Sequence, residues 1–112
     1  LEYSKGSLIP IDKEIESLQN YLELEQLRFN NKFQFAITSS DKVEFNMGLP
    51  PLLVQPFVEN AILNGMVPKE GNGRIDVTFD VQNDQLVCSI TDDGIGLIES
   101  KLLKENSMTA HQ

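Results

Sequence analysis

The chain has 112 residues, a length that suits one domain or a part of one. Asp and Glu outnumber Lys and Arg by 17 to 9, which gives a formal net charge of −8. This balance argues against a nucleic-acid binder and against docking on anionic lipid, because both need a basic face. The single cysteine, Cys88, excludes an intramolecular disulfide, and we expect it to be a small buried apolar residue. No apolar stretch approaches the roughly 20 residues of a membrane span.

The first predicted element is a helix over residues 12–29, which the Asn30-Asn31 pair should end. Apolar side chains recur along it at spacings of three and four, which defines one helical face. These side chains are Ile11, Ile15, Leu18, Leu22 and Phe29. Residues 1–9 show no periodicity and form a lead-in. Because the chain does not begin with Met, we expect it to be a piece of a longer protein.

Two short strands are expected after this helix. Apolar and polar residues alternate over 33–38, the signature of a half-buried strand. Val43 and Phe45 fit a second short strand, which Gly48 would end.

A second helix is expected around residues 56–64. Pro56 removes a backbone donor, so it suits the first position of a helix and not its interior. We therefore expect a turn over 51–55, a helix from Pro56 to residue 63 or 64, and Gly65 as its C-terminal cap.

The next predicted unit is a hairpin of strands 74–81 and 86–91, joined by a turn at 82–85. A further helix is expected over 97–104, followed by a mobile polar tail at 105–112. The order helix-strand-strand-helix-strand-strand predicts an α+β fold, in which helices pack on one face of a mostly antiparallel sheet.

The hairpin ends in an Asp-x-Gly-x-Gly pattern formed by Asp92, Gly94 and Gly96. Asp92 has the same parity as the apolar residues of strand 86–91, so its carboxylate should point inward. Such a carboxylate needs a partner, which the amine or ring N–H of a ligand could supply. The two glycines allow a ligand to approach the backbone closely. The alternative is ordinary Asp-Gly turn chemistry.

Asn60 and Asn64 lie one turn apart on the second helix and share a face. Two carboxamides directed at one space could hold a cation or phosphates, because amide oxygens are suitable ligands for Mg²⁺. The alternative is a solvated polar helix face.

Taken together, these features resemble the Bergerat (GHKL) ATP-binding fold. Residues 52–62, Leu-Leu-Val-Gln-Pro-Phe-Val-Glu-Asn-Ala-Ile, resemble most closely the LytS/YehU-type sensor histidine kinases. Residues 14–29 are similar to the segment that precedes the ATPase core in that family. The resemblance covers roughly residues 8–98.

The resemblance implies a two-layer α/β sandwich that binds ATP and Mg²⁺. Asn60 matches the asparagine that holds the Mg²⁺ bridging the ATP phosphates, and Glu59 matches the acidic residue that polarises the attacking nucleophile. Asp92 matches the aspartate that reads the adenine amine. Gly94 and Gly96 match the glycines that lie under the nucleotide.

The implied function is the ATP-binding catalytic domain of a two-component sensor histidine kinase. It would transfer the γ-phosphoryl group to a histidine upstream of this chain, for relay to a response regulator. Residues 1–30 would be a lead-in and linker helix after the dimerisation region, and residues 31–112 a partial ATPase domain. The full-length protein would be a homodimer and a bacterial inner-membrane sensor, with this part in the cytoplasm and the membrane segments elsewhere.

Two positions depart from the family pattern. Leu63 and Asn64 stand where the family usually has Lys and His, although Asn64 can still donate a hydrogen bond to a nucleotide. The second glycine-rich box should follow residue 112, and the phosphoacceptor histidine should precede residue 1. His111 lies in a polar tail, so we expect it to be inert.

Three readings therefore stay open. Pro56 occupies the position where ATP-hydrolysing relatives place a general base, which favours phosphotransfer over ATP hydrolysis. The departures at Leu63 and Asn64 favour a degenerate, non-catalytic signalling or dimerisation scaffold. An anti-sigma-type serine kinase would share the fold but lacks the Gln-Pro block.

Overall fold

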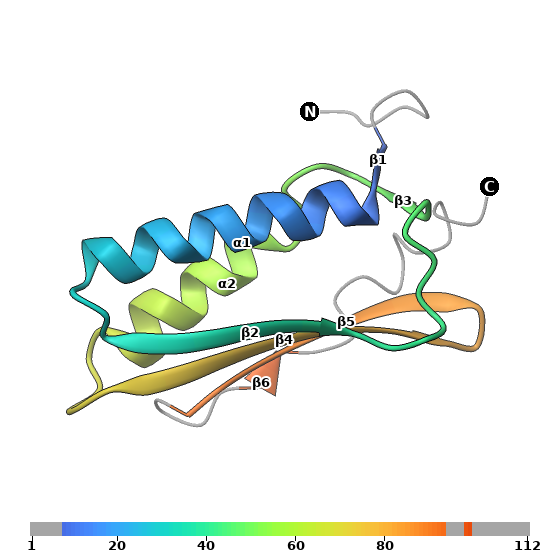
Figure 1. Cartoon of the computed structure of the whole chain (residues 1–112). Helices are drawn as coiled ribbons and strands as arrows, with labels where there is room; N and C mark the ends of the chain where they lie inside the picture. The colour runs from blue at the N-terminus through green and yellow to red at the C-terminus, as the bar shows by residue number, and fades with distance from the viewer. Residues whose placement is uncertain (1–7, 94–97, 100–112) are drawn as a thin grey trace.

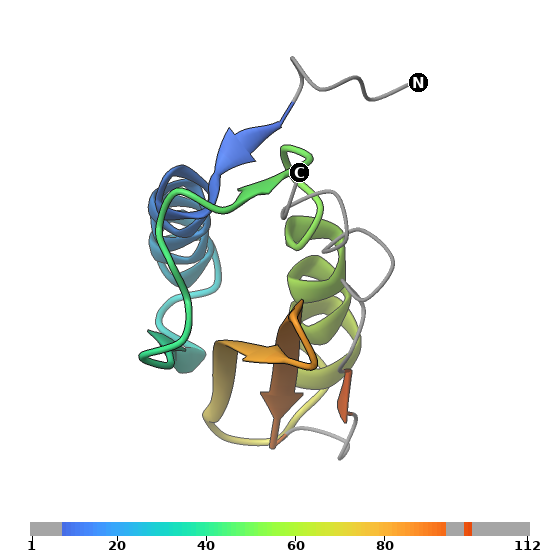
Figure 2. The same ribbon diagram turned by 90° about the vertical axis from the view of Figure 1, so that its right-hand side faces the viewer.

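The computed structural model describes residues 8–93 and the backbone of residues 98–99. Within them, two helices lie side by side over one face of a four-stranded sheet (Figure 1 and Figure 2). This is the α+β arrangement with helices on one face that the sequence predicts.

Helix α1 (Ile11–Arg28) begins and ends within one residue of the predicted bounds. Its periodic apolar side chains Leu18 and Leu22 are buried against the sheet. After the helix, Asn30 and Asn31 adopt left-handed φ values of 57° and 58°. Asparagine tolerates that conformation better than most residues, which explains why this pair ends the helix.

The predicted strand at Val43 and Phe45 is wrong. The backbone N–H of Val43 donates to Ser40 and that of Met47 to Glu44, so these residues form successive turns. These turns lead the chain back to the start of α1, where the N–H of Ile11 donates to the carbonyl of Met47. There a small second sheet forms, in which β1 (Ile9–Pro10) pairs antiparallel with β3 (Gly48–Leu49).

The main sheet has the strand order β2-β4-β5-β6. β2 (Phe33–Ser39) runs parallel to β4 (Gly73–Gln82), while β4 and β5 (Gln85–Asp92) form the predicted antiparallel hairpin. The sequence predicts a mostly antiparallel sheet, and two of the three strand pairs among the described residues are antiparallel. The β2–β4 pair is parallel, because the chain crosses over through α2 between these two strands.

The last described strand, β6 (Ile98–Glu99), pairs antiparallel with β5. The helix predicted over 97–104 is therefore wrong at these two residues. The rest of that helix and the tail at 105–112 lie outside the described residues.

Helix α2 (Gln55–Ala61) starts one residue before Pro56, close to the predicted start. It does not end at residue 63 or 64. It continues as a π-helix, η2 (Ile62–Met66), in which the N–H of Val67 donates to the carbonyl of Ile62 at 2.8 Å. Gly65 lies inside this wider turn, so its predicted role as a C-terminal cap is wrong.

One hydrophobic core joins the two layers. Leu18 and Leu22 of α1, Ile62 of η2, and Phe33 and Ile75 of the sheet belong to the same buried cluster. The first helix is thus packed into the same body as the sheet. The predicted boundary at residue 30 between a lead-in and an ATPase domain stays a prediction. None of the helices in the described part of the chain is long and apolar enough to cross a membrane.

Candidate functional site

The candidate site begins where β5 passes beneath η2. A Cβ atom placed on Gly65 would lie 2.7 Å from Oδ1 of Asp92 and 3.0 Å from its Cγ. Real Cβ atoms do not approach so closely, so the carboxylate occupies the space that the glycine leaves. Asp92 therefore lies on the helix-covered face of the sheet, as the parity of the strand predicts.

The two asparagines lie on the helix that contacts Asp92. Asn60, near the end of α2, and Asn64, in η2, are both exposed. Leu63, which precedes Asn64 in the chain, exposes 46% of its surface, so an apolar side chain faces solvent on the same helix as the two carboxamides. The structure thus brings Asp92 together with the helix that carries Asn60 and Asn64.

Glu59 is exposed, and the charge of its carboxylate affects the pKa of Tyr21 on helix α1. Burial, followed by the nearby carboxylates of Glu25 and Glu59, raises the pKa of Tyr21 to about 12. The hydroxyl of Tyr21 donates to Glu25 at 3.4 Å. The Glu59 carboxylate thus contributes to the raised pKa of the tyrosine on α1.

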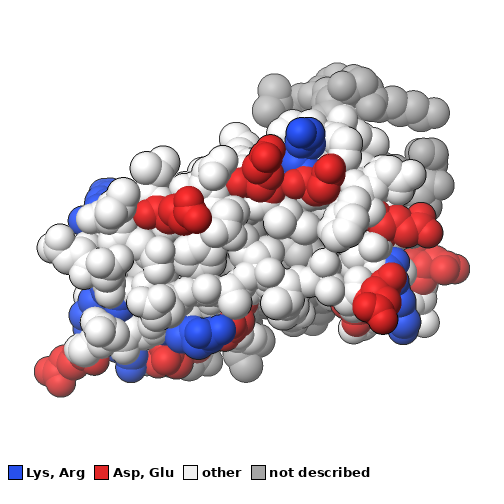
Figure 3. All heavy atoms as spheres, viewed as in Figure 1, with Lys and Arg blue, Asp and Glu red and all other residues white. Residues whose placement is uncertain are grey.

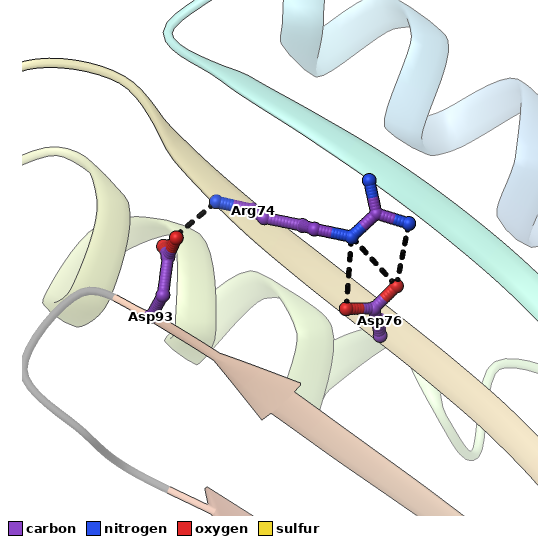
Figure 4. Close-up of polar contacts among 3 residues, drawn as sticks. All are labelled: Arg74, Asp76 and Asp93. Carbon is purple, nitrogen blue, oxygen red and sulfur yellow. Dashed lines mark hydrogen bonds and ion pairs between the residues drawn. The ribbon is translucent and has the colours of Figure 1, made fainter.

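The end of β5 is fixed by Asp93, the residue that directly follows Asp92. The backbone N–H of Arg74 donates to Oδ1 of Asp93 at 2.8 Å, and the N–H of Asp93 donates to the carbonyl of Arg74 at 3.2 Å. Figure 4 shows the Arg74 guanidinium turned the other way, where it bonds Asp76 at 3.0 Å. These bonds hold the strand in register up to the residue before Gly94.

The sequence pattern did not single out a buried acid, Glu14 of α1. It exposes only 2% of its surface, and its carboxylate contacts the segment that leads into α2. Desolvation by burial raises the pKa of Glu14, while backbone hydrogen bonds from Leu52 and Val54 oppose that shift. The helical period could have revealed it, because Glu14 lies three residues after buried Ile11 and four before buried Leu18.

Two other features bear on the chemistry. Cys88 is buried, as expected for a small apolar residue, and burial raises the pKa of its thiol to about 12. Gly94, Gly96 and His111 lie outside the described residues. Within the described residues, no group of three or more His, Cys, Asp or Glu side chains could hold a metal ion unaided.

The surface charge is mixed. On the face drawn in Figure 3, lysines and arginines are scattered and several have acidic side chains beside them. This agrees with the net charge of −8 and shows no continuous basic patch on that face.

No family model matches the chain. Among curated proteins, it is 34% identical over 104 residues to the sensor protein LytS of Staphylococcus haemolyticus. It is 36% identical over 111 residues to the sensor histidine kinase/phosphatase LytS of Staphylococcus aureus. It is also 31% identical over 97 residues to the sensor histidine kinase YpdA of Escherichia coli.

This chain is a homologue of the LytS-type sensor histidine kinases. These matches cover 91%, 96% and 87% of the chain but only 17%, 19% and 17% of the three relatives. The chain thus spans less than a fifth of the length of the LytS-type proteins that it matches.

A solved structure supports the fold of this LytS homologue. The catalytic domain of histidine kinase ThkA superposes with a TM-score of 0.56 at 14% identity. The match covers 84% of this chain and 60% of that domain. The chain has the fold of a histidine kinase catalytic domain, as the sequence resemblance implies.

Proposed function

We propose that this chain is the ATP-binding catalytic domain of a LytS-type sensor histidine kinase. In the full-length protein it transfers the γ-phosphoryl group of ATP to a histidine upstream of residue 1. One observation carries the proposal: the carboxylate of Asp92 lies against Gly65, on the same helix as Asn60 and Asn64. This contact supports the proposal because it brings the end of β5 against the helix that carries the two asparagines, although the two segments are far apart in the sequence.

The roles follow from the chemistry of each side chain. Asp92 is proposed to accept a hydrogen bond from the adenine amine, because its carboxylate lies on the helix-covered face of the sheet, against Gly65. Asn60 offers an exposed amide oxygen to a metal bound to the phosphates, and Asn64 offers a neutral hydrogen bond. Glu59 would polarise the attacking histidine.

Mg²⁺ fits this set of donors. The described residues contain no cluster of acids for a dedicated metal cage. Mg²⁺ commonly uses one or two protein oxygens together with phosphates and water, so one amide is sufficient. When bound, the ion neutralises charge on the transferring phosphoryl group. Gly94 and Gly96 are proposed to lie under the nucleotide.

The wider assignment rests on the kinase proposal. A response regulator would receive the phosphoryl group, and the full-length protein would act as a homodimer. Membrane segments outside this chain would place residues 31–112 in the cytoplasm as the ATPase domain, with residues 1–30 as its linker.

The test is autophosphorylation of the full-length protein with radiolabelled ATP. Asn60→Asp should reduce incorporation by about fivefold or more, because a carboxylate a few ångströms from a triphosphate adds repulsion in a partly shielded site, with a cost of roughly 1–4 kcal/mol. Asn64→Ala should cost at most one neutral hydrogen bond, about 1 kcal/mol. Asn20→Asp, which adds the same charge on the exposed face of α1, is the control.

The outcomes separate the candidate functions. If Asn60→Asp and Asn64→Ala both retain the wild-type rate, Asn60 is not a metal ligand. If the wild-type protein, with its upstream histidine present, incorporates no label, the chain is a non-catalytic scaffold. The exposed apolar surface of Leu63 is the observation that favours this second function, because it supplies no charge for phosphate.

A further inference from the structure

The buried carboxylate of Glu14 has no role in the function proposed above. Oε1 of Glu14 accepts a hydrogen bond from the backbone N–H of Leu52 at 3.2 Å. The backbone N–H of Val54 also lies close enough to this carboxylate to oppose the rise in its pKa. Among the residues that the structure describes, no Lys or Arg forms an ion pair with Glu14. Two backbone donors therefore stabilise a charge that is costly to bury.

These two donors belong to the residues that start α2. Val54 is the N-cap of that helix, and its own apolar side chain makes no capping hydrogen bond. Its carbonyl accepts the first bonds of the helix, from Phe57 at 3.0 Å and Val58 at 3.3 Å. Glu14 thus holds the N–H of the residue whose carbonyl begins α2.

Leu52 needs this external support. Its φ of 59° lies in the left-handed region, which a leucine rarely adopts. Its side chain is 54% exposed, so packing does not fix the conformation. The hydrogen bond to Glu14 is the described contact that holds its backbone in place.

The first turn of α1 anchors the rest of the same segment. The N–H of Ile11 donates to the carbonyl of Met47 at 2.7 Å, and β1 pairs with β3. Cys88 of β5 lies near enough to Glu14 for the carboxylate to contribute to the raised pKa of the thiol. The carboxylate therefore sits where α1, the entry to α2 and the sheet meet.

We infer that Glu14 is a positioning residue, which holds Leu52 and Val54 and so fixes where α2 places Asn60. Asn60 follows Val54 by less than two helical turns, so a shift of the N-cap moves Asn60 with it. The effect on phosphotransfer rests on the proposed function, whereas the effect on α2 does not.

The inference depends on the length of the Glu14 side chain, which carries its oxygens to Leu52 and Val54, more than on its charge. Two variants separate the effect of length from the effect of charge. Glu14→Gln keeps an acceptor oxygen at the same distance but removes the charge. Glu14→Asp keeps the charge but draws the oxygens back by one carbon–carbon bond. Glu16→Gln and Glu16→Asp, at an exposed position two residues along α1, are the matched controls.

The first readout is amide exchange of Leu52 and Val54 in the 112-residue chain, with the backbone and side-chain amide shifts of Asn60. In Glu14→Asp these two amides should exchange roughly fivefold to tenfold faster than in Glu14→Gln, the effect of losing one hydrogen bond of about 1 kcal/mol. The Asn60 shifts should move in Glu14→Asp and stay near wild type in Glu14→Gln. Both Glu16 variants should match the wild-type chain.

The second readout is radiolabel incorporation by the full-length protein, in which Glu14→Asp should lose about tenfold and Glu14→Gln should stay within about twofold. Equal protection of Leu52 and Val54 in all variants would overturn the inference, as would an unchanged Asn60 signal in Glu14→Asp. The reverse ranking, with Glu14→Gln impaired and Glu14→Asp normal, would show that charge matters and reach does not. If the wild type incorporates no label, the proposed function fails, and the Asn60 shifts alone decide the role of Glu14.

Discussion

At the scale of single residues, Gly65 determines how closely β5 can approach the helix above it. Any side chain there would occupy the space of the Asp92 carboxylate, because its Cβ would lie 2.7 Å from Oδ1. We expect Gly65→Ala to lower the free energy of unfolding by roughly 1–3 kcal/mol through overpacking. Urea denaturation followed by circular dichroism measures this change.

Asn64→Ala is the control for Gly65, because it introduces the same side chain at the preceding, exposed position of the same π turn. It should change stability by less than about 0.5 kcal/mol. A Gly65→Ala protein as stable as wild type would mean that Asp92 can leave the helix face without cost.

At the scale of secondary structure, the β4–β5 hairpin closes through only two residues. Gln82 pairs with Gln85, and the residues between them, Asn83 and Asp84, have φ values of 53° and 62°. Two left-handed residues define a type I′ turn, in which glycine is favoured at the second position. Asp84→Gly should therefore raise the free energy of unfolding by a few tenths to about 1 kcal/mol.

Two substitutions at Asp84 distinguish backbone strain from charge. Asp84→Asn removes the charge but keeps a residue that tolerates positive φ, so its thermal midpoint should stay near that of wild type. Asp84→Val places a β-branched residue in the left-handed region and should lower the midpoint. A midpoint that rises equally in Asp84→Gly and Asp84→Asn would attribute the gain to charge.

At the scale of the whole molecule, α1 and the sheet share one core. Leu22 is fully buried, whereas Leu24 on the same helix is 65% exposed. Leu22→Ala should cost about 2–5 kcal/mol because it leaves a cavity between helix and sheet. Leu24→Ala should change the free energy of unfolding by less than about 0.5 kcal/mol.

The shared core also predicts how the Leu22→Ala protein unfolds. Helix α1 and the sheet should lose structure in one transition, with coincident curves from far-ultraviolet circular dichroism and from amide exchange in β4. A helix that melts first, with the sheet intact, would indicate that α1 is a separate linker and not part of the core.

The sequence alone determined the elements whose signals are local. The period of α1, the Asn30-Asn31 stop, the alternation in β4 and β5 and the start of α2 near Pro56 all depend on neighbouring residues. The inward direction of Asp92 follows from the same alternation. These features could be predicted because side-chain spacing along one element fixes which face each residue occupies.

Only the tertiary structure decided the features that depend on segments distant in sequence. The parallel pairing of β2 with β4, the turns around Val43 and the π turn at Gly65 each depend on what packs opposite. Glu14 shows the reason most clearly. The helical period places it on the buried face of α1, but a carboxylate can be buried there only because Leu52 and Val54, 38 and 40 positions further along the chain, present their backbone donors to it.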